Sequence, residues 1–87
     1  MADMIELAEK AKARLERVTG LKASSVIGVA QEEGGHWMVT LEMLEKKSIP
    51  DSMDILGTYE VKIDEESNVL DFARTRLRRR GDTVDQV

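Results

Sequence analysis

Two stretches of this 87-residue sequence alternate between apolar and other side chains, and this pattern constrains the fold more than any other feature. Residues 36–45 and residues 55–63 each follow the period of two that is typical of a β-strand. One face of the two strands carries the large apolar side chains, namely Trp37, Val39, Leu41, Met43, Ile55, Tyr59, Val61 and Ile63. The pattern therefore predicts two paired strands with one buried face.

The remaining segments supply one helix and two further strands. Apolar residues at helical spacing predict a helix over residues 3–18, with Asp3 as its N-cap and Gly20 at its end. The β-branched run in residues 23–32 predicts a first strand, and Val69 to about Arg79 predicts a last one. The helical stripe is expected to face the sheet through Met4, Ala8, Ala11, Leu15 and Val18.

Short links between successive strands favour an antiparallel meander with the helix laid across one face, which is an α+β fold. A chain of 87 residues encloses one core, so we expect a single domain over residues 1–80 and a flexible tail over residues 81–87. One helix cannot cover both faces of such a sheet. The second face, with Met38, Leu44 and Leu56 among threonines and glutamates, is then either a partner surface or an ordinary mixed, solvated face.

Composition narrows the possible classes of protein. The sequence contains no cysteine, so disulfides and thiolate sites are excluded, and no apolar run reaches the roughly 18 residues of a membrane span. We expect a cytoplasmic protein without membrane insertion, cofactor or metal. Glu42 and Glu60 are expected on the same face, but no nucleophile or phosphate-binding loop accompanies them, so no enzyme is expected.

The net charge of −4 hides an uneven distribution. Residues 74–80 hold five of the thirteen basic residues and no acid, and outside them eight basic residues stand against seventeen acidic ones. Within this segment Arg74, Arg76, Arg78 and Arg80 are spaced by two and form what we call the arginine row. In a regular strand the row would project from one face, where it could meet an acidic protein partner or phosphate. The arginines could instead pair internally with Glu42, Glu45 or Glu60 across strands.

The segment from residue 36 to residue 80 resembles the gas vesicle protein O family. The shared pattern is a tryptophan-led strand ending in glutamates (37–45), an Ile-Pro-Asp loop (49–51), an Asp-Ile-Leu-Gly-Thr-Tyr-Glu-Val strand (54–61) and an arginine-rich last strand (74–78). Two positions depart from it: Ser48 stands where the family has arginine, and Leu77 stands where tyrosine is expected.

This resemblance implies a non-enzymatic accessory protein of gas vesicle assembly that acts through contacts with other gas vesicle proteins. Candidate partner-binding residues are those of the arginine row together with Ile49, Pro50, Asp51 and Asp54 of the loop. Without the resemblance, the loop is better interpreted as a simple link between strands. The alternative function is a small nucleic-acid-binding regulator that uses the same arginines; it is disfavoured by the acidic body and by the lack of aromatic residues among the arginines. The partner's identity and the oligomeric state stay open.

Overall fold

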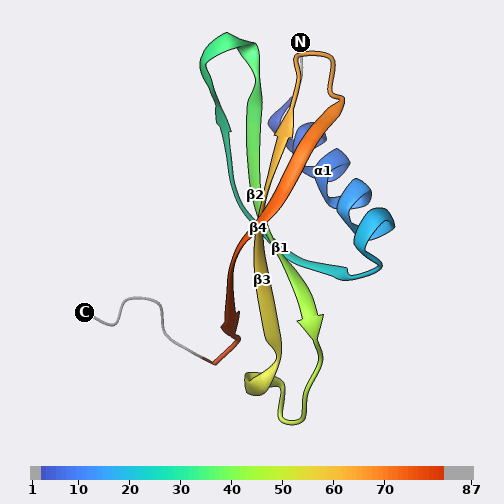
Figure 1. Cartoon of the computed structure of the whole chain (residues 1–87), viewed down its shortest axis with the longest axis vertical. Coiled ribbons are helices and arrows are strands. Elements are labelled where there is room, and N and C mark those ends of the chain that lie inside the picture. Colours follow the sequence, from blue (N-terminus) through green and yellow to red (C-terminus); the bar gives the residue numbers. More distant parts are fainter. Residues whose placement is uncertain (1–2, 82–87) are drawn as a thin grey trace, which may run out of the picture.

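The computed structural model describes residues 3–81 as one helix packed on a four-stranded antiparallel sheet (Figure 1). The helix is α1 (Met4–Thr19), and the strands are β1 (Lys22–Gln31), β2 (Trp37–Lys46), β3 (Ile55–Ile63) and β4 (Val69–Arg79). The order in the sheet is β1-β2-β3-β4, so each strand pairs with its neighbour in sequence. The predicted α+β meander is confirmed; residues 82–87, which hold most of the expected tail, lie outside the described residues.

The helix begins and ends where the sequence predicts. The Asp3 side chain accepts a hydrogen bond from the Ile5 amide at 3.0 Å, and the chain leaves the helix at Gly20 with a φ of 76°. The buried residues of the helix are Leu7, Ala11 and Leu15, which differ from the expected set.

Met4 and Val18, which we expected in the core, are about half exposed. Both lie on the same angular stripe as the buried residues, but in the first and last turns of the helix. The buried positions fall in the middle turns, so the ends of the stripe lie beyond the cover that the sheet provides.

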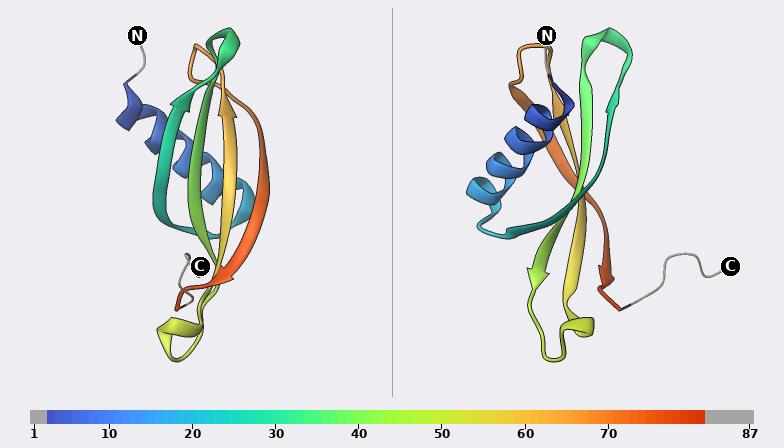
Figure 2. Two further views of the ribbon diagram at one scale, coloured as in Figure 1. Left: turned by 90° about the vertical axis from the view of Figure 1, so that its left-hand side faces the viewer. Right: turned by 180° about the vertical axis from the view of Figure 1, so that it is seen from behind.

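The core forms between α1 and the sheet, as the alternation predicts. Val39, Leu41 and Met43 of β2 pack there with Tyr59, Val61 and Ile63 of β3, while Trp37 and Phe72 are partly buried at its edge. α1 lies over this face alone, and the opposite face, called the far face from here on, is uncovered by any described element (Figure 2, left).

The turns follow local chemistry. Gly34 and Gly35, between β1 and β2, have φ values of 88° and 85°, in the left-handed region that glycine enters without cost. Between β3 and β4 the Asp64 carboxylate accepts hydrogen bonds from the Glu66 and Asn68 amides. The left-handed residue of that turn is Ser67, with a φ of 69°.

Five register shifts of the β-bulge type interrupt the regular pairing of the sheet. The register skips Ser24 and Ile27 in β1, and Glu45 at the end of β2. In β4 it skips Leu70 and Thr75. Wherever a residue is inserted in this way, the strict alternation of faces is shifted by one position. The shift at Thr75 decides where the arginines point.

Candidate functional site

The loop that joins β2 to β3 projects from one end of the sheet (Figure 1). It contains the short helical turn Asp51–Met53, and its Ile49 side chain is 98% exposed. Asp51 is exposed as well, so the loop presents an apolar and an acidic side chain close together in the chain. Pro50, between them, restricts its own backbone and that of Ile49.

Asp54 belongs to the same loop but is turned inward, with only 3% of its surface exposed. One carboxylate oxygen accepts a hydrogen bond from the Ser48 amide at 2.7 Å, and the other pairs with the Arg80 guanidinium at 3.2 Å. The Arg80 amide donates to the Asp54 carbonyl at 2.8 Å, and the Gly81 amide donates to the Ser52 carbonyl at 2.8 Å. Asp54 and Arg80 therefore anchor the loop to the end of β4.

The arginine row is split between the two faces of the sheet, contrary to the expectation of one continuous row. Tyr59 on β3 pairs with Arg74, and the preceding residue, Thr58, pairs with Arg76. Thr75, between the two arginines, is therefore the inserted residue. Arg74 consequently shares the helix-covered face with Tyr59, whereas Arg76 and Arg78 lie on the far face. A spacing of two in the sequence could not reveal this because the bulge adds one residue between the two arginines.

Arg74 completes a polar cluster at the edge of the core. Its Nη1 lies 3.5 Å from Glu45 Oε1, and the Tyr59 hydroxyl donates to Glu45 Oε2 at 2.7 Å. Burial raises the pKa of the Tyr59 phenol, and the Glu45 carboxylate raises this pKa further, while the nearby Arg74 charge partly lowers it. Arg74 thus has an internal partner.

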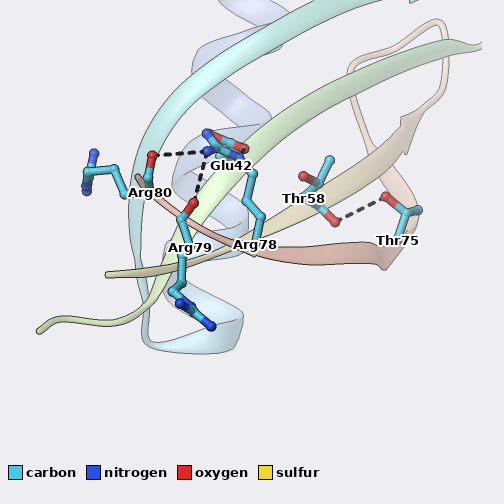
Figure 3. A network of polar contacts seen from close by, with 6 residues as sticks. All are labelled: Glu42, Thr58, Thr75, Arg78, Arg79 and Arg80. Carbon is cyan, nitrogen blue, oxygen red and sulfur yellow. Dashed lines mark hydrogen bonds and ion pairs between the residues drawn. The ribbon is translucent and has the colours of Figure 1, made fainter. Parts of the chain in front are cut away.

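Arg78 makes a bidentate pair with Glu42 on the far face (Figure 3). Nε donates to Oε2 at 2.8 Å and Nη2 donates to Oε1 at 2.9 Å. Because Glu42 is on β2 and Arg78 on β4, the arginine side chain must cross β3 to reach it. Glu42 is 6% exposed, and Leu56, which pairs with Arg78 in the register, is 1% exposed although it too lies on the far face.

Arg76 differs from the other members of the row, because no carboxylate within residues 3–81 pairs with it. Its side chain lines a groove of about 500 Å³ on the far face. We call this hollow the threonine groove; it is lined by Ile27, Thr40, Glu42, Thr58, Thr75, Arg76 and Arg78.

Of the residues predicted for partner binding, Ile49, Pro50, Asp51 and Arg76 are exposed and are not held in an ion pair within residues 3–81. Arg74 and Arg80 are exposed as well, but each is paired with a carboxylate of the chain.

Sequence reasoning had not assigned the three threonines of the groove to a site. It had considered Glu42, Glu45 and Glu60 as internal partners of the arginines, and the structure pairs Glu45 with Arg74 and Glu42 with Arg78. The alternating pattern did place Thr40 and Thr58 on one face, but only the bulge brings Thr75 beside them.

The described residues form no cluster typical of a catalytic or metal-binding site. Among residues 3–81, no three His, Asp or Glu side chains gather closely enough to hold a metal ion. Glu42 is engaged by Arg78 and Glu60 is exposed, so the two glutamates do not act on a common site. Within the same part of the chain, α1 is too short and too polar to span a membrane.

Comparisons with a family model and with curated proteins find the same family. A family model described as "Gas vesicle synthesis protein GvpO" matches residues 1–84. The chain is 37% identical over 69 residues to gas vesicle protein O of Streptomyces sp. (strain CB03234), which covers 79% of this chain and 53% of that protein.

Two archaeal proteins are also similar. Gas vesicle protein O of Haloferax mediterranei is 29% identical over 62 residues, or 71% of this chain and 44% of that protein. Gas vesicle protein O1 of Halobacterium salinarum is 31% identical over 58 residues, or 67% of this chain and 47% of that protein. The chain spans about half the length of the curated relatives it matches. No solved structure matches it significantly.

Proposed function

This chain belongs to the gas vesicle synthesis protein GvpO family, and we propose that it is a non-enzymatic accessory protein of gas vesicle assembly. In this proposal it acts in the cytoplasm by binding other gas vesicle proteins, and its contact surfaces are the loop from Ile49 to Asp51 and the far face around Arg76. The chemistry it contributes is recognition alone.

The observation that carries the proposal is the fully exposed Ile49 on an anchored loop. An isoleucine that is 98% exposed gains nothing from the fold itself. The loop beneath it is held by Asp54, which ties Ser48 to Arg80. A loop fixed in this way loses little conformational freedom when its apolar tip is buried by a partner, which favours binding.

The arginine pairs support a protein partner over a nucleic acid. Arg74, Arg78 and Arg80 face carboxylates of the chain itself at 3.5, 2.8 and 3.2 Å. Phosphate binding depends on several cations acting together, and these three are already neutralised internally. The alternative of a nucleic-acid-binding regulator predicts salt-sensitive binding to DNA or RNA, and a filter-binding assay across salt concentrations should find none.

A pull-down with the gas vesicle proteins encoded beside this gene tests the proposal. We expect wild-type protein to be retained by at least one of them, and Ile49→Ser to reduce retention. Ile5→Ser on α1 is the matched control, since Ile5 is a second isoleucine with a largely exposed side chain, away from the loop. Retention by none of these proteins, or equal loss in the two variants, would contradict the proposal.

Vesicle formation in cells gives an independent measurement. A strain that lacks this gene should make fewer gas vesicles, and wild-type protein should restore them. Ile49→Ser should restore them less well than Ile5→Ser at equal protein levels. Normal vesicles in the deleted strain would count against any role in assembly.

A further inference from the structure

The threonine groove combines features of a binding site on a face that no described element covers. Its volume of about 500 Å³ lies within the range of roughly 300–1,000 Å³ that is typical of ligand sites. Figure 2 (left) looks onto this face, with α1 lying behind the sheet. The groove crosses all four strands, because its lining residues come from β1, β2, β3 and β4.

The floor of the groove is polar and already neutral. Glu42 and Thr58 are only 6% and 8% exposed, and the Glu42 charge is matched by the bidentate contact with Arg78. Thr75 donates its hydroxyl to the Thr58 carbonyl at 3.3 Å (Figure 3), which fixes the bulge against β3. A ligand in the groove would therefore meet a fixed polar floor rather than an uncompensated acid.

One positive charge at the groove is uncommitted within residues 3–81, and it belongs to Arg76. The bulge at Thr75 is the cause, because it separates Arg76 from Arg74 and leaves Arg76 on the far face opposite Thr58. β-Bulges re-aim side chains in this way next to binding sites. The guanidinium presents several N–H donors in a planar fork, a shape that suits a carboxylate.

The other walls supply an apolar contact and hydrogen-bonding groups. Ile27 is itself the inserted residue of a bulge in β1 and lines the groove with 56% of its surface exposed. The hydroxyl of Thr40 lies on the neighbouring strand and can both donate and accept. An extended peptide offers the matching set: a carboxylate for Arg76, an apolar side chain for Ile27 and backbone groups for the threonines.

We propose that the threonine groove binds a short segment of a partner protein in which an acidic side chain lies beside an apolar one. The proposal deepens the proposed function and rests on it, because it gives the chemistry of one contact surface. Charge complementarity selects this occupant: the chain carries a net charge of −4, so an acidic segment is repelled by most of the surface and is accepted where Arg76 stands.

Binding of a defined peptide to the intact protein tests the groove directly. The probe is a capped pentapeptide with glutamate between two valines. The control peptide has glutamine in place of the glutamate. Titration followed in amide NMR spectra should shift the signals of Thr40, Thr58, Thr75 and Arg76. The glutamine peptide should bind about fivefold more weakly, as expected for loss of one exposed ion pair.

Two variants and their controls separate the contacts. Arg76→Gln should lower the affinity for the glutamate peptide about fivefold and leave the affinity for the glutamine peptide unchanged. Arg14→Gln removes the same charge from α1 and should change neither affinity. Ile27→Thr should lower the affinity for both peptides, whereas Ile49→Thr in the loop should lower the affinity for neither. Absence of shifts at the groove, or equal affinity for the two peptides in wild-type protein, would overturn the proposal.

The peptide titration and the pull-down fail in distinguishable ways. Retention by a gas vesicle protein without peptide binding at the groove would leave the proposed function standing and remove the groove proposal. Selective peptide binding at the groove, with no gas vesicle protein retained, would keep the groove as a peptide site and remove the proposed function. Groove shifts produced by an oligonucleotide and not by the glutamate peptide would overturn the groove proposal.

Discussion

The Glu45 carboxyl group fills the space above Gly57 that a side chain at residue 57 would occupy. A Cβ atom built on Gly57 would stand 3.0 Å from the Glu45 Cδ atom, and closer still to one of the carboxylate oxygens. Gly57 is therefore the residue that lets Glu45 reach both Tyr59 and Arg74. Glycine is needed here for space, because the backbone φ of Gly57 is not in the left-handed region.

Gly57→Ala is expected to destabilise the protein by about 1 kcal/mol, because the added methyl group must push aside the Glu45 side chain and not rigid backbone. The displaced Glu45 carboxylate would lose its contact with the Tyr59 hydroxyl. Gly28→Ala is the matched control, since a Cβ atom on Gly28 meets nothing within 4 Å. That control should stabilise the protein slightly, by up to about 1 kcal/mol. Urea unfolding of the two variants measures both effects.

Arg78→Met is expected to cost about 3 kcal/mol, because it leaves the buried Glu42 carboxylate without its partner. Glu42→Leu in the same chain should recover most of this loss, since the unpaired buried charge is then gone. Chemical unfolding of the two single variants and the double variant gives the coupling energy. Losses that simply add would show that the pair contributes no coupling across β3.

The fold was predictable from the sequence because its main signals are local and agree with one another. The alternation of residues 36–45 and 55–63 correctly assigned Val39, Leu41, Val61 and Ile63 to the core. The N-cap Asp3 predicted the start of the helix. The exposure of Met4 and Val18 was missed, because spacing defines the direction of a stripe but not how far the sheet extends beneath it.

The candidate site was less predictable, because it depends on contacts between distant residues. No local signal distinguishes Thr75 as a bulge, so Arg74 and Arg76 were assigned to one face. Asp54 and Asp51 are both aspartates of the same loop, yet Asp54 is buried and Asp51 is exposed. The difference arises from Arg80, which is 26 residues away in the chain and approaches only when β4 pairs with β3.

Asp54→Ala should therefore destabilise the protein by about 2 kcal/mol, as expected for loss of charge-assisted hydrogen bonds to Ser48 and Arg80. Asp51→Ala, in the same loop with its side chain exposed, should change stability by less than about 0.5 kcal/mol. Hydrogen exchange at the Ser48 amide should accelerate in the first variant only. Equal behaviour of the two variants would contradict the anchoring role of Asp54.

Tyr59 is the one tyrosine of the sequence, so phenolate absorbance reports on it alone. Its pKa is raised above the ordinary value of 10.0, first by burial and then by Glu45. Glu45→Gln should lower the titration midpoint toward the ordinary value without reaching it, because burial remains. Arg74→Gln should shift the midpoint in the opposite direction, because the Arg74 charge stabilises the phenolate.

The same shift predicts how stability depends on pH at the alkaline end. A phenol whose pKa is higher in the folded state than in the unfolded state contributes its full stabilisation below pH 10.0. That contribution is lost as the pH rises from there through the folded-state pKa, since the unfolded chain releases the proton first. Fluorescence of Trp37, the one tryptophan, follows unfolding in parallel with the absorbance titration. A wild-type midpoint at the ordinary value, with Trp37 still in its folded environment, would show that Tyr59 does not hold the Glu45 carboxylate.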